Sequence, residues 1–421
     1  MNTLWQTIRL GSACEKIGSG ATPRGGSEVY QATGISLIRS QNIYNDGFKR
    51  DGLAFIGDKH ARELENVNVQ SGDVLLNITG DSVARVCQVP DKILPARVNQ
   101  HVAIIRPKKN VLDARFLHYF LIHPQTQAHM LGLAGAGATR NALTKGMIES
   151  FEIKAPSFSE QRTIAAVLGS LDDKIELNRR MNETLEALAQ SLFKSWFVDF
   201  DPYLHTVGVM PNQIPKGWRE TVLLECCENI FSGGTPSTQS PDYWGGDIPW
   251  LSSGETRGRF IIDTEKTITP LGVANSSTRQ ARAGSTVIAS AGQGHTRGQT
   301  SFLTFDSYIN QSVVVLVADK KISSDLFLFF DLARRYEQFR QMSDSQSSRG
   351  SLTTKLLAEM KVVVPPRELI SKFDETVAPM TKKIVANLHE SRTLAALRDA
   401  LLPKLLSGEL RVPKNEKEVL S

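Results

Sequence analysis

The chain of 421 residues contains one internal repeat, and this repeat limits its architecture more than any other feature. The offset between the two copies shrinks from 213 residues, at Trp5 and Trp218, to 209 residues, at Pro156 and Pro365. The other matched positions are Ser19-Gly20-Ala21-Thr22-Pro23 with Ser232-Gly233-Gly234-Thr235-Pro236, Gly72 and Gly80 with Gly284 and Gly292, and Asn99-Gln100 with Asn310-Gln311. A globular module that occurs twice, each time followed by a long helix, suits a partner with two related sites in sequence. A periodic polymer such as DNA is such a partner.

The composition is that of an ordinary soluble globular protein, with 41% hydrophobic and 22% charged residues. No apolar run is long enough to span a membrane, and the start of the chain does not resemble a signal peptide. The four cysteines show no CxxC spacing, so neither a zinc site nor a disulfide framework is indicated, and we expect a cytoplasmic protein. The net charge of +5 and the pI of about 8.9 permit nucleic-acid binding without requiring it.

Each copy begins with a mixed module of short strands and short helices. Residues that alternate with period two, bounded by Gly, Asp and Asn turns, predict strands at 35–39, 73–78 and 102–105, and at 248–251, 286–289 and 313–317. Short helices are expected near 114–122 and 324–334. We therefore predict an α+β module of about 150 residues in each half.

A long helix is predicted after each module. The sequence Ser157-Phe158-Ser159-Glu160 has the form of a capping box, and apolar residues then recur at steps of three and four until Asp201-Pro202. The second run extends to Ser407-Gly408, a typical helix end. Because Pro379 and Pro403 lie inside it, we expect this helix to be kinked or broken there.

The apolar period of 3.5 is that of a coiled-coil seam, on which Asn178 and Asn387 occupy matching positions. A polar residue on a seam weakens it but fixes the register of the two helices, and this is the role predicted for both asparagines. In the alternative, each helix packs separately on its own module and the asparagines are exposed. The matching of the two seams favours paired helices.

The predicted fold class is α+β, with two tandem α/β modules separated by two long helices that form an antiparallel coiled coil with pseudo-twofold symmetry. The predicted boundaries are 1–158 for the first module, 159–200 for the first spacer helix, 201–217 for a linker, 218–366 for the second module, 367–412 for the second spacer helix and 413–421 for a tail.

At these motifs the chain resembles the specificity subunits of type I restriction-modification enzymes, over almost its whole length. Besides the Ser-Gly-x-Thr-Pro turns, the resemblance is carried by Pro215-Lys216-Gly217-Trp218, by Pro156 followed by Glu160-Gln161-Arg162-Thr163-Ile164-Ala165, and by Leu401-Leu402-Pro403-Lys404-Leu405-Leu406-Ser407-Gly408-Glu409-Leu410. Arg367-Glu368 lacks the Glu-Gln pair of the first copy, so the motif does not mark where the second helix begins.

The resemblance implies a non-catalytic recognition subunit, in which each module reads half of an interrupted sequence in double-stranded DNA. It implies that the helices set the gap and dock two methyltransferase subunits, with restriction subunits added for translocation and cleavage in phage defence. It places S-adenosylmethionine on the methyltransferase, ATP and Mg²⁺ on the restriction subunit, and no cofactor on this chain.

Loops rich in Arg, Asn, Gln, Ser and Thr suit contacts to base edges and to phosphates. A solvated surface turn is the alternative for each loop. The candidate DNA-binding residues are Thr22, Arg24, Arg39, Gln41, Asn42, Thr79, Arg85, Arg140 and Lys145 in the first module, and Thr235, Ser252, Glu255, Arg257, His295, Arg297, Arg349 and Lys355 in the second.

Comparison of the two copies distinguishes predicted contacts to bases from predicted contacts to the DNA backbone. Positions that differ between the copies are predicted to read different bases, and the contrasts are Arg39 with Ser252, Gln41 with Gly254, and Asn42 with Glu255. Positions that agree are predicted to contact the DNA backbone, namely Arg140 with Arg349, and Lys145 with Lys355 one residue out of register.

Four apolar residues at the end of the first long helix, Leu192, Phe193, Trp196 and Phe197, are predicted to be exposed and to dock a partner. This prediction argues against a stand-alone DNA-binding protein, which needs no such surface. A protein–protein scaffold is a third possibility, and its binding would be insensitive to salt, unlike contacts to phosphates.

Catalytic motifs are weak in this sequence. Asp199-Phe200-Asp201-Pro202-Tyr203 lacks the second proline of an adenine methyltransferase motif and fits a helix-terminating turn better. Gly18-Ser19-Gly20 and Gly233-Gly234 lack the Gly-Lys-Ser/Thr of a phosphate-binding loop. The eight histidines form no metal-binding motif, so we predict recognition rather than catalysis, and no metal.

Overall fold

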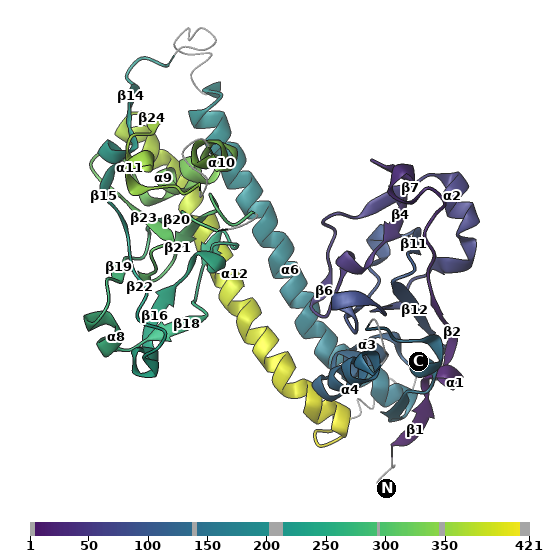
Figure 1. Ribbon diagram of the computed structural model, residues 1–421. Coiled ribbons are helices and arrows are strands. Elements are labelled where there is room, and N and C mark those ends of the chain that lie inside the picture. Colours follow the sequence, from purple (N-terminus) through teal and green to yellow (C-terminus); the bar gives the residue numbers. More distant parts are fainter. Residues whose placement is uncertain (1–4, 137–140, 202–213, 293–294, 345–349, 413–421) are drawn as a thin grey trace. The chain divides into compact units, whose positions relative to one another are not determined.

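The computed structural model describes residues 5–136, 141–201, 214–292, 295–344 and 350–412. It divides into two compact units (Figure 1): Met1–Lys174 together with Leu394–Ser421, and Ile175–Thr393. The division falls inside both long helices. Each unit therefore holds one module and a stretch of each helix, and the units are described separately below.

The first module is built from two larger sheets, a short ladder and the two-stranded pair of β5 (Ile43–Tyr44) with β6 (Gly47–Phe48). A four-stranded sheet has the order β10-β9-β12-β2, and a five-stranded sheet has the order β3-β7-β4-β11-β8. The strands of these sheets are β2 (Cys14–Ser19), β3 (Tyr30–Gln31), β4 (Ile35–Ile38), β7 (Ala54–Ile56), β8 (Asn68–Val69), β9 (Val74–Asn77), β10 (Val86–Gln88), β11 (Ala96–Val98) and β12 (Val102–Pro107). The ladder pairs β1 (Gln6–Arg9) with β13 (Glu152–Ala155), and thus joins the two ends of the module.

The second module repeats this plan. Its sheets have the orders β15-β23-β20-β21-β17 and β18-β16-β22-β19. The strands are β15 (Cys227–Ser232), β16 (Trp244–Leu251), β17 (Phe260–Ile261), β18 (Lys266–Ile268), β19 (Arg279–Ala281), β20 (Thr286–Ala289), β21 (Thr300–Leu303), β22 (Ser307–Ile309) and β23 (Val313–Ala318). The closing ladder pairs β14 (Arg219–Val222) with β24 (Lys361–Val364).

Strand register shows that the repeat in the sequence is a repeat in the fold. Gln6 opposes Ala155 in the first ladder, and Arg219 opposes Val364 in the second, which are the same positions shifted by 213 and 209 residues. Each module also has one parallel pair within its second sheet, β4 with β11 and β16 with β22. The predicted α+β fold with an internal repeat is confirmed.

Successive side chains of the central strands point to opposite faces of the sheet, and the apolar side chains on the two faces form two separate cores in each module. In β9 and β12, Leu75 and Ile104 face the other sheet, whereas Leu76 and Ile105 face the helices. A strand that is covered by other elements on both faces has apolar residues at nearly every position of its sequence. This explains β23, in which all six residues from Val313 to Ala318 are buried.

Short helices cover the outer face of the first-named sheet of each module. They are α3 (Ala114–Ile122), α4 (Pro124–Gly135) and α5 (Lys145–Glu149) in the first module, and α9 (Asp325–Ala333), α10 (Tyr336–Asp344) and α11 (Thr354–Ala358) in the second. Asp113 and Ser324 cap α3 and α9 by accepting backbone N–H groups. Both predicted short helices therefore form, and each begins at a capping side chain.

The long helices are α6 (Phe158–Phe197) and α12 (Arg367–Ser407). Ser157 Oγ accepts the backbone N–H of Glu160 at 3.3 Å, as the capping box predicts. We expected α12 to be kinked or broken at Pro379 and Pro403; the break is wrong, because the helix runs through both prolines, and the kink stays a prediction. The packing of Val377 and Leu405 into apolar cores on either side holds the helix together where a hydrogen bond is missing. None of the described helices is both long and apolar enough to cross a bilayer.

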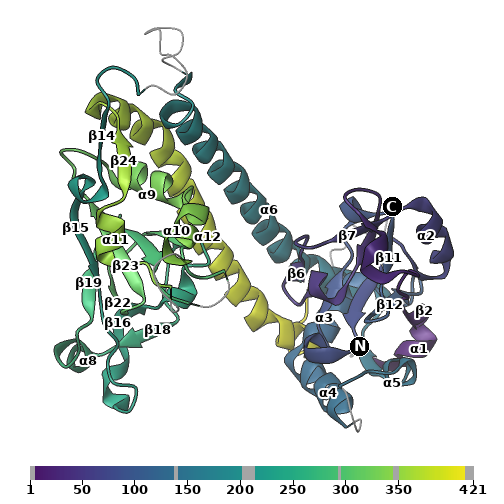
Figure 2. The ribbon, with the colours of Figure 1, turned by 45° about the horizontal axis from the view of Figure 1, so that its top comes forward.

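Within each unit the stretches of α6 and α12 pair in opposite directions (Figure 2). In the second unit Asn178 contacts Asn387 and Glu390, and the later residue Asn182 contacts the earlier residue Ile384. In the first unit, Glu160 binds Arg411 and Asp172 binds Arg398, each at 2.7 Å. Asn178 and Asn387 are fully buried, which excludes separately packed helices with exposed asparagines.

Each long helix ends against the tryptophan that begins a module. In the second unit, Phe200 follows α6 with φ of 60° and packs edge-on against Trp218, with ring centroids 5.0 Å apart. In the first unit, Gly408 follows α12 with φ of 75°, and a Cβ there would lie 3.3 Å from Trp5. The left-handed residue ends the helix and aims the following chain at the indole. This contact explains why Trp5 and Trp218 recur in the repeat.

Candidate DNA-recognition surface

The repeated Ser-Gly-x-Thr-Pro turn lies against the repeated Asn-Gln segment in both modules. A Cβ on Gly20 would lie 2.0 Å from the carbonyl oxygen of Val98, and one on Gly233 would lie 2.1 Å from that of Ile309. Glycine is therefore required for this close backbone approach. The turn and the Asn-Gln segment form one surface feature, which occurs twice.

The threonine and glutamine side chains of this feature are exposed. In the second module the Thr235 hydroxyl donates to Gln311 Oε1 at 2.5 Å. In the first module, Gln100 Nε2 lies 3.2 Å from His101 Nε2, and Thr79 Oγ1 lies 2.6 Å from His101 Nδ1. Thr22 and Arg24 are exposed beside the same turn. Gln100 and Gln311 were recognised in the sequence as a repeat but not as site residues, although their exposure and identity mark them as candidates.

A 3-10 turn follows a matched strand in each module, and here one predicted contrast is wrong. Asn42 Oδ1 accepts the Arg39 N–H at 3.0 Å, and Glu255 Oε1 accepts the Ser252 N–H at 2.9 Å. Asn42 is fully buried and also donates to the carbonyls of Lys49 and Asp51. Both side chains cap the same turn, so Asn42 is held by the fold rather than free to read a base, and Glu255 serves the same structural purpose.

Arg39 and Gln41 project from that turn in the first module. Arg39 Nη2 and Gln41 Nε2 donate to the carbonyl of Gly52 at 2.5 and 3.1 Å, and the Arg39 guanidinium lies 5.4 Å from the Tyr30 ring centroid. Gly52 has φ of 66°, and a Cβ there would collide with Gln41. An arginine and a glutamine are thereby held side by side, and the second module has Ser252 and Gly254 at these positions.

The remaining candidates differ in how freely they can contact a ligand. Arg257 and His295 are exposed, and Arg85 is half-buried with its guanidinium 4.5 Å from the Tyr44 ring centroid. Ser252 is half-buried and its hydroxyl donates to Glu255 at 3.1 Å. Lys145 and Lys355 are exposed, and each pairs with the glutamate four residues later, at 3.5 and 3.9 Å.

Arg297 is a structural residue, contrary to the prediction that it contacts DNA. Its guanidinium binds Asp344 and donates to the carbonyl of Gly350 at 2.6 Å, and only 13% of its side chain is exposed. It thus ties the loop after β20 to the end of α10. Arg140 and Arg349, the predicted backbone contacts, lie outside the described residues.

The predicted docking residues at the end of α6 are also corrected by the structure. Phe193 and Phe197 are 2% and 6% exposed, and both pack with Phe327 and Phe373 inside the core of the second unit. Leu192 and Trp196 are half-buried against the same core. The second module covers this end of the helix, so these side chains stabilise the unit and are not available to bind a partner.

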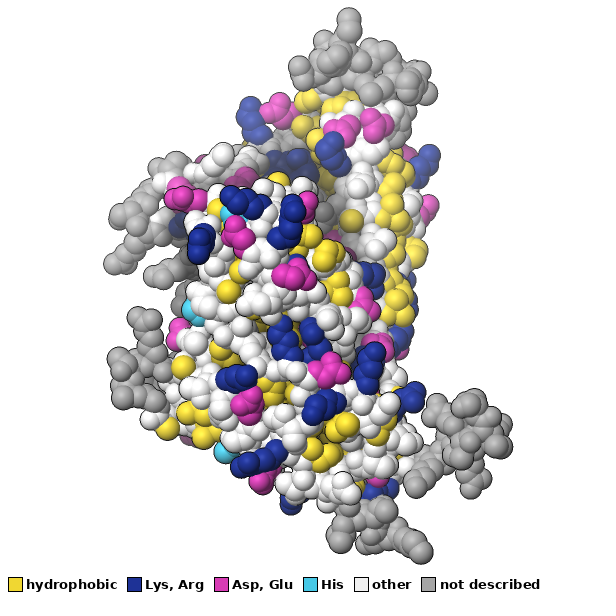
Figure 3. Space-filling view, turned by 90° about the vertical axis from the view of Figure 1, so that its right-hand side faces the viewer, with side chains coloured by type: hydrophobic (Ala, Val, Ile, Leu, Met, Phe, Trp, Pro, Cys, Tyr) yellow, Lys and Arg dark blue, Asp and Glu magenta, His cyan; other side chains and the backbone are white. Residues whose placement is uncertain are grey.

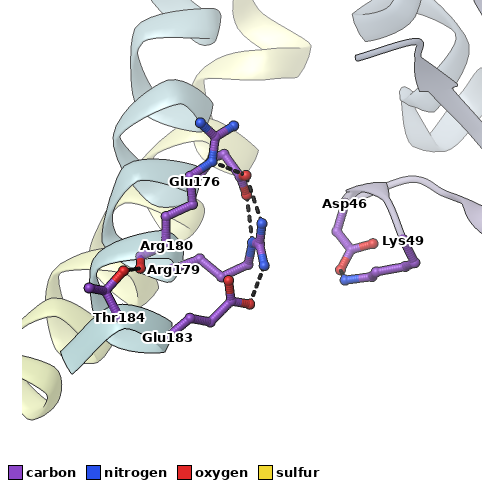
Figure 4. Close-up of polar contacts among 7 residues, drawn as sticks. All are labelled: Asp46, Lys49, Glu176, Arg179, Arg180, Glu183 and Thr184. Carbon is purple, nitrogen blue, oxygen red and sulfur yellow. Dashed lines mark hydrogen bonds and ion pairs between the residues drawn. The ribbon is translucent and has the colours of Figure 1, made fainter. Parts of the chain in front are cut away.

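The outer surface of α6 carries an ion-pair network, drawn in Figure 4. Glu176 lies between Arg179 and Arg180, 2.6 and 2.7 Å from their Nε atoms, and Arg179 also binds Glu183. Hydrogen bonds from Arg179, together with Arg180, lower the pKa of Glu176 to about 2 despite partial burial. Pairs at three- and four-residue spacing hold the arginines along the helix. Figure 4 also draws the Asp46–Lys49 pair of the first module.

Charge is mixed on the face of the first unit that is turned toward the viewer in Figure 3. Lys and Arg side chains alternate there with Asp, Glu and apolar groups. Such a face does not form one continuous basic field. The charge of this face as a whole therefore does not mark it as a surface for a polyanion.

The catalytic alternatives find little geometric support in the described part of the chain. Asp199 binds Lys194, and Phe200 packs on Trp218, so these two residues belong to a helix-terminating turn, as the sequence predicts. All four cysteines are buried as free thiols, and burial raises the pKa of Cys14 and Cys87 to about 12 and that of Cys226 to about 11. Among the described residues, His, Cys, Asp and Glu form no group of three that could hold a metal ion.

Two copies of one module, each with its own exposed loops and joined by helices that pair, define a two-module recognition protein. The model of the type I restriction modification DNA specificity domain matches residues 2–187 and 215–388. The chain therefore belongs to this family. Its part in such a system is sequence recognition rather than catalysis, as the sequence predicted.

Named relatives agree with this assignment. The chain is 24% identical to the type I restriction enzyme HindI specificity subunit of Haemophilus influenzae, over 89% of this chain and 94% of that protein. It is 26% identical to the MjaIX specificity subunit of Methanocaldococcus jannaschii, over 94% and 91%. The crystal structure of a type I S subunit from M. genitalium shares the fold, with a TM-score of 0.63 and 18% identity over 96% of this chain and 97% of that one.

Proposed function

We propose that each module of this specificity subunit reads one half of a bipartite target in double-stranded DNA. The observation that carries the proposal is the pair of modules with matching strand register but different exposed loops. A shared scaffold places the loops equivalently, and differences between the loops select different bases. An interrupted target of two unlike half-sites is the expected result.

Readout of bases needs side chains that are held in position but can still reach the groove. Arg39 and Gln41 meet this requirement, since both are fixed by the Gly52 carbonyl at the surface of the first module. Arginine binds guanine and glutamine binds adenine through paired hydrogen bonds in the major groove. Arg257 and His295 are the exposed candidates in the second module.

The paired long helices would set the gap between half-sites and dock two methyltransferase subunits, to which restriction subunits are added. We place S-adenosylmethionine on the methyltransferase and ATP with Mg²⁺ on the restriction subunit. With the end of α6 buried, the docking residues proposed here are Leu188 in α6 and Leu397 in α12, each 46% exposed. They are equivalent in the repeat, 209 residues apart, as two identical partner subunits would require.

The test is co-expression with a methyltransferase subunit encoded beside this chain, followed by single-molecule sequencing of host DNA for methyladenine. The proposal expects methylation at one interrupted motif, and the loss of that methylation when this chain is deleted. DNA binding without a methyltransferase complex would support a stand-alone DNA-binding protein. A complex whose binding is insensitive to salt and to DNA would support a protein scaffold.

A further inference from the structure

The two glutamines of the repeated Asn-Gln segment are exposed, although their neighbours are fixed by the fold. Asn99 and Asn310 are buried, and each accepts the backbone N–H two residues later, at 3.1 and 3.0 Å. Packing therefore accounts for the asparagines. It does not account for Gln100 and Gln311, whose side chains point to solvent at the same place in both modules.

Neighbouring side chains orient both amides. Thr235 donates to Gln311 Oε1, which turns the Nε2 donors of that amide away from the threonine. In the first module, the Gln100 amide is held by His101, whose other ring nitrogen is next to Thr79. The backbone of the turn is closely packed, because Gly20 and Gly233 contact the ends of β11 and β22 and leave no room for a side chain. Gln311 therefore keeps both of its Nε2 hydrogens for a ligand, whereas Gln100, whose Nε2 already donates to His101, keeps one. Each amide belongs to the segment packed against the turn that carries the exposed Thr22 or Thr235.

The ligand of this feature must be common to both modules. The loop residues that differ between the modules, such as Arg39 and Ser252, suit bases that differ between half-sites. In a DNA duplex, the part that is the same at any two half-sites is the sugar–phosphate backbone. Threonine hydroxyls and glutamine amides are common donors to phosphate oxygens, and such contacts set the position of a protein without reading sequence.

We propose that Thr22 with Gln100, and Thr235 with Gln311, form two equivalent sites for a DNA phosphate, one in each module. The proposal rests on the proposed function and adds to it the residues that position each module on its half-site. It predicts a contact that is independent of sequence. Because the donors are neutral, their loss would lower affinity without a large change in its dependence on salt.

The experiment compares the full chain, in complex with its methyltransferase, with Gln100→Ala, Gln311→Ala and the double variant. The probes are two duplexes, one with the methylated motif and one without it. Each single substitution is expected to weaken binding to both duplexes by about 3- to 10-fold, as for the loss of one hydrogen bond, and the sequenced motif is expected to stay the same. Gln125→Ala, in an exposed part of α4, is the matched control.

A second measurement identifies the ligand atom. Duplexes with a neutral methylphosphonate at single positions should bind the wild-type complex less well at one phosphate in each half-site. At that phosphate, Gln311→Ala should show no additional loss. A motif that changes in one half would show that the glutamine reads a base, and unchanged affinity for both duplexes would show that it has no contact; either result overturns the proposal. Failure of the wild-type complex to bind or methylate DNA would instead refute the proposed function.

Discussion

At the scale of single residues, the fold divides polar loop side chains into those that serve the structure and those available to a ligand. Asn42 and Arg297 belong to the first group, because their hydrogen-bonding atoms are directed at the chain's own backbone and carboxylates. Arg39 and Gln41 also donate to a backbone carbonyl, but Gln41 is exposed and Arg39 is only half-buried, so both side chains can still meet a ligand. Residue type alone does not separate the two groups.

Gln41→Ala should change one half of the methylated motif and leave the other half intact. A pair of hydrogen bonds to one base discriminates by about 1–3 kcal/mol, so relaxed specificity at one position is expected. Sequencing of methyladenine in cells that carry the variant measures this directly. An unaltered motif would remove Gln41 from the base-reading residues.

Unlike Gln41→Ala, the substitution Asn42→Ala should affect stability and not the methylated motif. Since Asn42 caps a turn and supports two carbonyls, its loss should lower stability by about 1–3 kcal/mol. Thermal unfolding of the complex should show this decrease, and the motif should keep its bases. Altered bases with unchanged stability would contradict the structural role.

His118 should make the first unit sensitive to mild acid. Burial lowers the pKa of His118 from 6.5 to about 4, with Arg115 and Arg398 acting in the same direction and Asp172 opposing them. The unfolded chain therefore binds this proton first, and stability falls as the pH drops from about 6.5 to about 4, by up to about 1.4 kcal/mol per pH unit. Unfolding midpoints measured across this range should decline less steeply in His118→Gln. An equal slope in both proteins would assign the acid sensitivity to other groups.

At the scale of elements, the two long helices combine buried polar contacts with exposed leucines. Asn178 donates to Glu390 at 2.8 Å and Asn387 donates to Asn182 at 2.8 Å, and both hydrogen bonds join one helix to the other. Shifting one helix past the other would leave these amides unpaired, which supports the predicted role in register. The capping turn at Ser157 and the left-handed Gly408 fix where the helices begin and end.

Leu188→Glu and Leu397→Glu should each weaken binding of the methyltransferase by about tenfold or more, because each places a charge where an apolar contact is proposed. Both leucines are already 46% exposed, so the fold of the free chain should be unaffected. Co-purification and analytical ultracentrifugation would measure the assembly. Leu271→Glu, at a leucine that is 50% exposed in α8 (Pro270–Ala274), is the matched control. Equal assembly of all three variants would place the docking surface elsewhere.

At the scale of the whole molecule, the two compact units each contain buried free thiols. Cys14 and Cys87 lie in the first unit, and Cys226 and Cys227 lie in the second. Because burial both shields these thiols and raises their pKa, they should react slowly with alkylating reagents in the folded protein. Their modification therefore reports unfolding of the unit that contains them.

Pulse alkylation in increasing urea, read by peptide mass spectrometry, should label the cysteines in pairs, one pair for each unit. Cooperative opening of a compact unit exposes its thiols together. Labelling of Cys14 without Cys87, or of Cys226 without Cys227, would show that the unit does not open as a whole. Rapid labelling of all four without urea would contradict their burial.

Comparison of the chain with itself was sufficient for the repeat. Local patterns were sufficient for the strand positions, the short helices and the cap at Ser157, because each of these depends on residues close together along the chain. Period-two alternation correctly predicted β4, β9 and β12. The apolar seam of the two long helices correctly predicted that Asn178 and Asn387 lie between them. Contacts between segments far apart in the sequence determined which side chains are buried and whether α12 is continuous. They buried Phe193 and Phe197 against the second module and carried α12 through Pro379 and Pro403. They also turned Asn42 and Arg297 inward, because a polar side chain bonds whichever partner the fold brings to it, and no local pattern names that partner.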